Sequence, residues 1–458
     1  MPIYERQQRD ELDQLVEGVT QGTLSRRAFL QRATALGLSL SVAGSILAAC
    51  GPASNSNPTS VDVLNVWSGE EQASFKAVVA PFTKNTGITV KIESTRDLNA
   101  TLTARIQGRN PPDIAVLPNP GKMQQLAQQG HLVSLDNFLD TNTIQSQYSK
   151  GWIDLGSYNG KVYALFYKAA NKGTVWYSPK QFQTNNYQIP TTWDQLISLS
   201  NQIANSSKFP WAMGVSSGSA SGWPGADWID QIYLNLNGPD LYDKWVAHQI
   251  PWTDASVKSA FQYFGQIVGG KHYINGAPQS ILATGFQDAS YLPFDSPPKA
   301  YMYYLGDFTE GFITGQFKSA VAGTDFNFFP FPVINQQYAN ALTGGADVVT
   351  ALTNNSAVKQ LIQYMATPDA QAIWVKRGGF TATNNQVPSS DYPDAVSGAS
   401  AKALAAAPIF RFGADDLMPS QVEDAFWKGV LTFIGDQTQL NSVLSQIESV
   451  AQQAYTSS

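Results

Sequence analysis

The chain has 458 residues, of which 43% are hydrophobic and 14% are charged. This composition supplies a large apolar core and excludes a wholly disordered chain. The 29 basic and 35 acidic residues give a net charge of −6, without the basic excess expected of a nucleic-acid-binding protein. One cysteine excludes an internal disulfide, and three scattered histidines are too few for a histidine-built metal site. We expect no metal and no cofactor.

The first fifty residues have the pattern of an export signal. Arg26 and Arg27 precede an uncharged stretch of seventeen residues, 33–49. That stretch is shorter than the roughly twenty residues needed to span a bilayer. A basic flank, an apolar stretch and small residues before a cleavage point predict a signal over residues 1–49. The paired arginines resemble those of twin-arginine signals.

The signal ends in Leu-Ala-Ala-Cys, which resembles a bacterial lipobox. The resemblance implies that Cys50 becomes the lipidated first residue, which ties the protein to the membrane through a lipid anchor. The alternative is a short membrane anchor with an idle cysteine. Residues 50–60 then form a flexible tether, since after the cysteine they are only Gly, Pro, Ser, Asn, Ala, Thr.

The next segments alternate between strand and helix patterns. Residues 61–67 alternate apolar and polar side chains, which is typical of a strand, and residues 70–85 carry an apolar helical stripe. Further strands are predicted over 88–92 and 113–117, and further helices over 98–107 and 123–129. The order β-α-β-α-β-α predicts an α/β domain with a largely parallel sheet.

The rest of the chain continues this pattern less regularly. The predicted strands are 162–166 and 174–177, and the predicted helices are one that Thr192 caps, 254–268, 356–366 and the whole of 423–455. Two stretches without clear periodicity, 168–171 and 386–394, are candidate crossings between lobes.

Two motifs could indicate hydrolytic chemistry. Residues 214–218 match G-x-S-x-G, but no helical pattern follows Ser216, so we favour a loop over a nucleophile elbow. Glu70-Glu71 and Asp415-Asp416 are acidic pairs, yet sequence neighbours do not provide two carboxylates set apart across a glycosidic bond. We therefore interpret these acids as solvated surface residues.

Aromatic residues are abundant, with 11 Trp, 19 Tyr and 23 Phe. Several stand in polar, loop-like contexts: Trp223, Trp228, Phe308, Phe312 and Trp427. Such rings either stack on the apolar faces of a sugar or serve as minor core plugs, and the sequence leaves both open.

Six segments in a fixed order resemble the solute-binding proteins of bacterial carbohydrate ABC importers, the maltose-binding-like family, and within it the α-glucoside-binding branch. The segments are LNVWSGEEQASFKAVVAPFTKNTGITV, NPPDIAVLPNPGKMQQLAQQGHLVSLD, GKVYALFYKAANKGTVWYSPK, PTTWDQL, TGGADVVTALTNNSAVKQLIQYMATPDAQ and MPSQVEDAFWKGV. The resemblance covers nearly all of residues 61–455.

The resemblance implies an α/β, two-lobe periplasmic-binding-protein-like fold with a ligand cleft between the lobes. It places lobe 1 at residues 61–168 plus 345–385 and lobe 2 at residues 169–344 plus 386–458. It further implies a monomer, without enzymatic chemistry, that closes on a carbohydrate by hinge motion and delivers it to the integral-membrane permease of an importer.

The resemblance also implies the ligand-binding residues. These are Ser68, Glu70, Arg96, Asp97, Asn119, Asn171, Lys172, Trp223, Trp228, Phe308, Asp347, Arg411 and Trp427. Phe308 stands where the family often has Trp, and Trp427 matches its C-terminal stacking tryptophan. The low charged fraction favours a neutral ligand, and the resemblance favours an α-glucoside.

Two other functions remain open from the sequence. One is a secreted carbohydrate-active hydrolase that uses a carboxylate pair, and the other is a receptor component that presents its liganded form to a sensor. The sequence does not name the sugar, its length or its linkage.

Overall fold

The computed structural model describes residues 26–35 and 59–456. The chain divides into two units, Met1–Thr59 and Ser60–Ser458. The first unit contains the helix α2 (Arg26–Ala35), and the predicted lipidation site Cys50 and most of the export signal and tether lie outside the described residues. Among the described residues, no helix has both the length and the apolar character that a membrane crossing needs.

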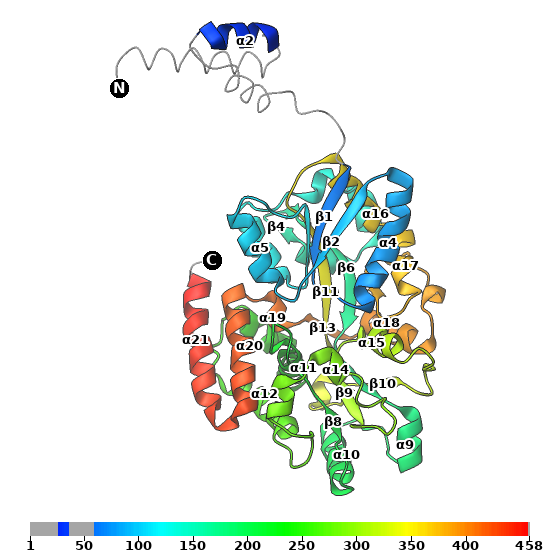
Figure 1. The fold of residues 1–458 in the computed structure, drawn as a ribbon. Coiled ribbons are helices and arrows are strands. Elements are labelled where there is room, and N and C mark those ends of the chain that lie inside the picture. Colours follow the sequence, from blue (N-terminus) through cyan, green and yellow to red (C-terminus); the bar gives the residue numbers. More distant parts are fainter. Residues whose placement is uncertain (1–25, 36–58, 457–458) are drawn as a thin grey trace. The chain divides into compact units, whose positions relative to one another are not determined.

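Lobe 1 of the second unit is built on a seven-stranded sheet in the order β12-β6-β11-β3-β1-β2, with β13 paired to β11 (Figure 1). Its strands are β1 (Ser60–Asn65), β2 (Thr89–Ser94), β3 (Ile114–Leu117), β6 (Ala164–Asn171), β11 (Ala341–Ala351), β12 (Thr381–Ala382) and β13 (Ile409–Phe412). The α/β class predicted from the sequence is confirmed.

The expectation of a largely parallel sheet is wrong. β1 pairs in parallel with β2 and β3, as the alternating β-α order predicts. However, β11 runs antiparallel to both β3 and β6, and β12 runs antiparallel to β6. The sheet is mixed because β11 returns from lobe 2, far along the chain, and enters between β3 and β6.

Helices cover both faces of this sheet. The helices are α4 (Glu70–Thr86), α5 (Leu98–Gln107), α6 (Pro120–Gln128), α7 (Thr141–Gln147), α8 (Lys150–Leu155), α16 (Ser356–Met365) and α17 (Pro368–Val375), beside a small hairpin of β4 (Ser157–Tyr158) and β5 (Lys161–Val162). α4 buries Phe75, Val78 and Phe82 on one stripe and ends at Gly87, whose φ of 74° few other residues adopt readily.

Lobe 2 contains a four-stranded sheet in the order β10-β7-β9-β8 and a larger set of helices. The strands are β7 (Thr174–Tyr177), β8 (Trp211–Ala212), β9 (Met302–Tyr304) and β10 (Asn327–Pro330). The helices are α9 (Pro179–Asn185), α10 (Trp193–Asn205), α11 (Trp223–Val246), α12 (Ala255–Val268), α13 (Gln279–Ala283), α14 (Phe286–Ala289), α15 (Thr309–Gln316), α18 (Ala395–Ala406), α19 (Ala414–Leu417), α20 (Ser420–Gly435) and α21 (Leu440–Thr456).

Two predictions for lobe 2 need correction. The stretch around Trp223 and Trp228 is the start of α11 and not a loop, with Pro224 in its first turn. The predicted single helix 423–455 is two helices, because the chain turns at Asp436, which is extended and whose side chain caps the short turn that follows.

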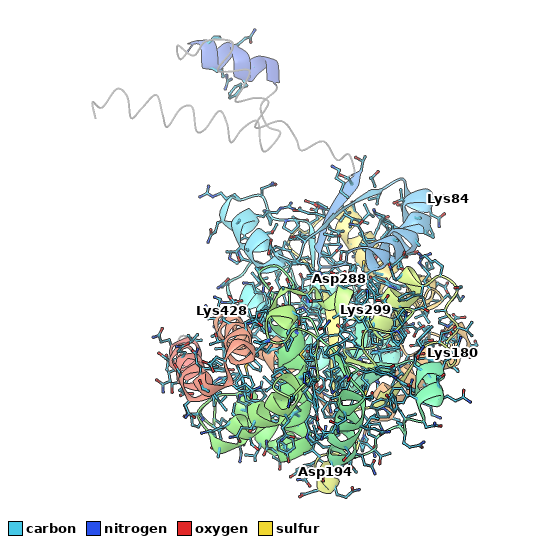
Figure 2. The ribbon with its side chains drawn as sticks, turned by 60° about the horizontal axis from the view of Figure 1, so that its bottom comes forward. Lys84, Lys180, Asp194, Asp288, Lys299 and Lys428 are labelled. Carbon is cyan, nitrogen blue, oxygen red and sulfur yellow. The ribbon has the colours of Figure 1, made fainter. Side chains whose placement is uncertain are left out.

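The chain passes between the lobes at the ends of long strands. β6 remains a regular strand through Asn171, where an irregular crossing was expected, and Lys172 and Gly173 lead directly into β7. Since β13 belongs to the lobe 1 sheet and β6 continues beyond residue 168, that sheet extends across the expected boundaries. The assignment of residue ranges to the two lobes stays a prediction. Charged residues such as Lys84, Lys180 and Asp194 lie on the outer surface (Figure 2).

Candidate functional site

A cavity lies between the two lobes, with about 830 Å³ of empty space including its opening to solvent. It is lined by Val66, Trp67, Glu71, Arg96, Pro118, Asn119, Lys168, Ala170, Lys172, Ser217, Ala220, Trp223, Phe286, Phe308, Phe312, Gly345, Ala346, Asp347, Asp415, Asp416 and Trp427.

Lobe 2 contributes an aromatic wall. The ring of Trp223, at the start of α11, lies 5.1 Å from that of Phe286 and 6.2 Å from that of Phe308. Phe312, one turn along α15, lies 5.8 Å from Phe308 and is buried. Lobe 1 places a cation against this wall, since the guanidinium of Arg96 lies 4.8 Å from the ring centre of Phe286. This contact joins the two lobes by cation–π attraction.

Trp427, on α20, lines another side of the cavity. Its indole Nε1 donates a 2.8 Å hydrogen bond to Oδ2 of Asp415, on the neighbouring short helix α19. Because the ring nitrogen is held in this way, the indole has a fixed orientation beside the cavity.

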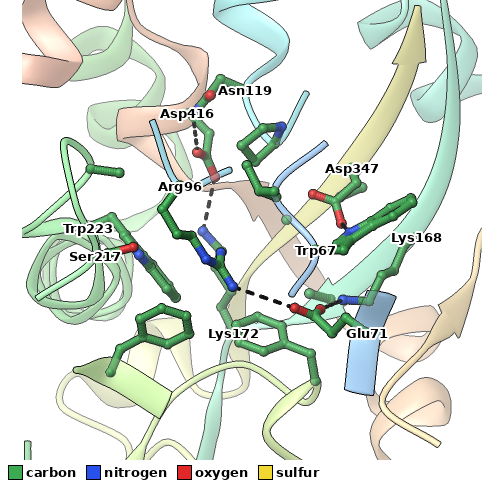
Figure 3. A pocket seen from close by; sticks show the side chains of 18 of the residues that line it. Trp67, Glu71, Arg96, Asn119, Lys168, Lys172, Ser217, Trp223, Asp347 and Asp416 are labelled. Atoms are coloured by element: carbon green, nitrogen blue, oxygen red, sulfur yellow. Dashed lines mark hydrogen bonds and ion pairs between the residues drawn. The ribbon is translucent and has the colours of Figure 1, made fainter. Parts of the chain in front are cut away.

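A second polar group joins α4 to β6. The ammonium of Lys168 lies 2.6 Å from Oε1 of Glu71, and the guanidinium of Arg96 lies 3.7 Å from Oε2 (Figure 3). Although burial opposes the charge on Lys168, the Glu71 carboxylate and then Asp347 raise its pKa. Lys168 therefore stays charged and paired within the cavity wall.

Asp347 points into the same region from β11, opposite a β-bulge in β6. Asp347 and Val348 pair with Lys168 and Phe166, so the extra residue of the bulge is Tyr167. Oδ2 of Asp347 accepts a 2.7 Å hydrogen bond from the indole of Trp67. Burial raises the pKa of Asp347, and Lys168 opposes that rise.

The floor of the cavity holds a buried cation among carboxylates. Lys172 lies 2.6 Å from Asp227 and 3.0 Å from Asp416, and Asn119 donates a 2.8 Å hydrogen bond to Oδ1 of Asp416. Burial raises the pKa of Asp416 to about 8 even beside Lys172. The two neighbouring carboxylates, by contrast, raise the pKa of Lys172 well above its usual value against the effect of burial.

The structure brings seven of the thirteen predicted residues to this cavity. They are Arg96, Asn119, Lys172, Trp223, Phe308, Asp347 and Trp427. Two more lie beside it: Oδ1 of Asp97 accepts the backbone N–H of Ser219, and Glu70 pairs with Lys318. Their direct contact with a ligand stays a prediction.

The other four predicted residues lie outside the cavity lining. Trp228 is buried in the core of lobe 2, with its ring 4.4 Å from that of Tyr304. Arg411 forms a paired hydrogen bond with Asp243 at 2.6 and 2.7 Å. Asn171 is buried and accepts the N–H of Gly173, and the backbone oxygen of Ser68 accepts the N–H of Glu71.

Sequence reasoning missed Glu71, Lys168, Asp415 and Asp416. The interpretation of the acidic pairs as solvated surface residues is wrong for three of their four members, because Glu71, Asp415 and Asp416 are buried. For Glu71 a signal existed, since it stands on the buried stripe of α4 with Ser74, Phe75 and Val78. The partners of the Asp pair, Asn119 and Lys172, are too distant in sequence to leave a local pattern.

The G-x-S-x-G segment is a loop, as predicted. Ser216 pairs by a backbone bridge with Gly285, and its N–H donates to the carbonyl of Thr284. His248, one of the three histidines, lies 3.1 Å from Glu448 on α21. The segment serves to shape the cavity through its neighbour Ser217.

Two lobes with a cavity between them, lined by aromatic rings and by polar groups from both sides, define a ligand-binding protein of the two-lobe type. The model of the bacterial extracellular solute-binding protein family matches residues 67–372. The chain belongs to this family, which consists of binding proteins, and its periplasmic-binding-protein-like fold is thereby confirmed.

Relatives of known description support this assignment. The chain is 33% identical to the osmoprotective compounds-binding protein of Synechocystis sp. over 409 residues, which cover 88% of this chain and 96% of the relative. It is 32% identical to the alpha-glucosides-binding periplasmic protein of Rhizobium meliloti, with 82% and 83% covered. Among solved structures, a chitin oligosaccharide binding protein superimposes with a TM-score of 0.76 at 21% identity, covering 87% of this chain and 99% of that one.

Proposed function

We propose that this protein captures a neutral, polyhydroxylated solute, a small α-glucoside, and presents it to the membrane permease of an ABC importer. The single observation that carries the proposal is the cavity, where one wall is aromatic and every acidic or basic group in the lining has a partner within the protein. The names of the two most fully covered relatives support the choice of α-glucosides and osmoprotective compounds.

The pairing of the charged groups favours a neutral solute. Glu71 is paired with Lys168, Asp416 with Lys172, and Asp415 and Asp347 with indole N–H groups. A charged ligand would have to displace one of these partners and leave a buried charge uncompensated, which is costly. Hydroxyl groups, in contrast, can use the remaining lone pairs of the same carboxylates.

The aromatic wall favours a sugar among neutral solutes. The rings of Trp223, Phe308 and Trp427 provide flat apolar surfaces, and the carboxylates of Glu71 and Asp347 line the same cavity. A pyranose ring has an apolar C–H face and a polar rim, so it is complementary to such a cavity.

Capture requires that the lobes close around the solute. The contacts that join the lobes at the cleft include those of Asp97 with Ser219, Glu70 with Lys318, and Arg96 with Phe286. We propose that these contacts form on closure and break on release, as in a hinge motion. The closed monomer is then the form that docks on the permease, and no chemical step takes place.

We also propose that the protein is exported and held at the outer face of the cytoplasmic membrane by lipid at Cys50. The twin arginines and the Leu-Ala-Ala-Cys sequence support this assignment. Cys50→Ser should move the protein from the membrane fraction to the soluble fraction. Persistence of the variant in the membrane fraction would contradict lipid anchoring at this residue.

The test of the ligand class is thermal unfolding of the purified protein against maltose, trehalose, sucrose, maltodextrins, xylo-oligosaccharides and monosaccharides. A ligand at a hundred times its Kd stabilises the folded state by about 2.7 kcal/mol. We expect a shift of a few degrees with an α-glucoside. The shift should be lost in Trp427→Ala and kept in Trp374→Phe, since Trp374 lies in the lobe 1 core.

Three outcomes would contradict the proposal. A folded sample that none of these sugars stabilises would reject the ligand class, and stabilisation by charged solutes alone would reject the neutral cavity. Turnover of aryl glycosides that is lost in Glu71→Gln would make the protein a hydrolase.

A further inference from the structure

Behind the cavity floor lies a layer of buried carboxyl groups, three of which the proposed function does not use. Five such groups surround the buried ammonium of Lys172 or adjoin its partners: Asp227, Asp230, Asp415, Asp416 and Glu423. Asp415 and Asp416 reach the cavity, whereas Asp227, Asp230 and Glu423 are not part of its lining. These three residues can affect a ligand only through the residues that line the cavity.

Asp230 connects to the cavity through a short path. It lies on α11, is 1% exposed, and its Oδ2 accepts a 2.7 Å hydrogen bond from the backbone N–H of Ala414. Ala414 is the first residue of α19, and Asp415 follows it and accepts the indole N–H of Trp427 at 2.8 Å. α19 has only four residues, so a single anchored N–H fixes a large part of its backbone.

The backbone at this point has no room to move independently. A side chain on Gly413 would lie 3.1 Å from the carboxylates of Asp415 and Asp416 and 3.2 Å from Nζ of Lys172. Gly121 of α6 packs so closely on the carbonyl of Met418 that an added Cβ would lie 2.4 Å away. The segment from Gly413 to Met418 is therefore clamped between lobe 1 and α11, and Asp230 supplies its polar anchor on the α11 side.

We propose that Asp230 is a positioning residue for ligand capture, which sets the orientation of the Trp427 ring through Ala414 and Asp415. This inference rests on the proposed function, because it assumes that Trp427 contacts the ligand. Asp230 itself does not touch the cavity.

Asp230 performs this role as a neutral carboxyl group. Its Oδ1 is buried and has no donor, and the hydrogen bond to Ala414 needs only an acceptor at Oδ2. Two ammonium groups, Lys172 and Lys122 beside Glu423, cannot balance five carboxylates in a buried space, so some of the carboxyl groups hold protons. Burial, and then the charge of Asp415, raise the pKa of Asp230 well above its usual value.

Other ionisable groups face Asp230 from each element around it. Asp227 is on its own helix, Lys172 follows β6, and Asp415 is on α19. The phenol of Tyr242, one of the groups near Asp230, donates to the carbonyl of Phe412. Of these, only Lys172 favours ionisation of Asp230, and it is already paired with Asp227 and Asp416.

The experiment compares Asp230→Asn, which keeps an acceptor and cannot ionise, with Asp230→Leu, which removes the acceptor. Affinities for maltose, trehalose and sucrose are measured by calorimetry. We expect Asp230→Asn to bind within about twofold of the unaltered protein, and Asp230→Leu to bind about tenfold more weakly, the cost of one lost buried hydrogen bond. Asp240→Asn, an exposed acid of α11 beyond its break at Gly238, is the matched control.

A second readout needs no ligand. The indole ¹⁵N–¹H resonance of Trp427 is identified among those of the 11 tryptophans by its absence in Trp427→Phe. We expect this resonance to shift in Asp230→Leu and to stay in place in Asp230→Asn. Between about pH 5 and 8 its titration curve should be the same in Asp230→Asn as in the unaltered protein, because a neutral Asp230 loses no proton there.

Several results would overturn the inference. Equal affinities and unshifted resonances in both variants would show that Asp230 positions nothing. An Asp230→Asn variant as weak as Asp230→Leu, or one that lacks a titration step of the unaltered protein, would show that the ionised form is needed. If Asp230→Leu does not fold, the titration of Asp230→Asn still decides the protonation state. If no sugar binds the unaltered protein, the proposed function fails while the resonance of Trp427 still tests the positioning role.

Discussion

Asp97 in lobe 1 accepts a 2.8 Å hydrogen bond from the backbone N–H of Ser219 in lobe 2. The bond lowers the pKa of Asp97, so this carboxylate is fully charged at neutral pH. Gly218 makes the approach possible, because it has a φ of +61° and a Cβ there would lie 3.0 Å from Oδ1 of Asp97. The contact joins the lobes directly at the edge of the cleft.

The first prediction concerns the lifetime of the complex. Asp97→Ala should leave the association rate unchanged and increase the dissociation rate several-fold, since one hydrogen bond is lost from the closed form. Stopped-flow tryptophan fluorescence with the best-binding sugar measures both rates. Asp194→Ala, which removes an exposed acid on α10, should change neither rate. An unchanged dissociation rate in Asp97→Ala would show that the contact does not hold the lobes closed.

The second prediction separates two tryptophans that are five residues apart. Trp223 is half-buried in the cavity wall, and Trp228 is in the core of lobe 2. Trp223→Ala should weaken ligand binding about tenfold through loss of a stacking surface. Trp228→Ala should lower the free energy of unfolding by about 3–5 kcal/mol and leave the Kd of the folded protein nearly unchanged. Calorimetric titration and urea unfolding of both variants provide the comparison. Weaker binding in Trp228→Ala, with unchanged binding in Trp223→Ala, would contradict the assignment of Trp223 to the ligand.

The third prediction concerns the buried pair of Glu71 and Lys168. Their side chains are only 10% and 5% exposed. Lys168→Met alone should lower the free energy of unfolding by about 3 kcal/mol, because Glu71 is left without its main partner. Glu71→Gln combined with Lys168→Met should recover much of that loss, since no buried charge remains unpaired. Urea unfolding without ligand measures the free energy of unfolding of both single variants and of the double variant. A double variant that loses more stability than the two single variants together would contradict the argument.

The fourth prediction is a dependence of stability on pH. Burial raises the pKa of Asp416 to about 8 and that of Asp227 to about 7. Unfolded aspartates titrate near 3.9, so between about pH 4 and 8 the folded chain binds more protons than the unfolded chain. The contribution of these groups to stability is therefore fully present below pH 4 and is lost as the pH rises through 7 and 8.

The expected slope is at most about 1.4 kcal/mol per pH unit for each group. Urea unfolding between about pH 5 and 8 measures it, and Asp227→Asn should flatten the profile because one titrating group is removed. A stability that rises with pH across this window in the unaltered protein, with no change in the variant, would mean that these carboxyls are ionised throughout.

Local patterns predicted much of the architecture. The helix over 98–107 and the strand over 174–177 were placed at their observed ends, because periodicity and flanking residues act within a few positions. The start of α11 was missed because Gly, Ser, Trp and Pro around residue 223 show no amphipathic stripe, and its first turns are buried on nearly all sides. A helix surrounded by protein has no polar face to mark it.

The cavity was predictable only in part. Trp427 and Arg96 could be located from the resemblance of their segments to a known family. Asp416, however, owes its role to Asn119 and Lys172, which lie 297 and 244 residues away. No spacing rule links such positions, so burial of the acidic pair is a property of the folded chain alone.

The compensated charges at the cavity have a consequence for the medium in which the protein works. Mobile ions weaken attraction between exposed charges over about 8–10 Å at moderate ionic strength, but they act little on buried pairs such as Lys172 with Asp227. The neutral-solute capture proposed above should therefore change little when the ionic strength around the protein changes.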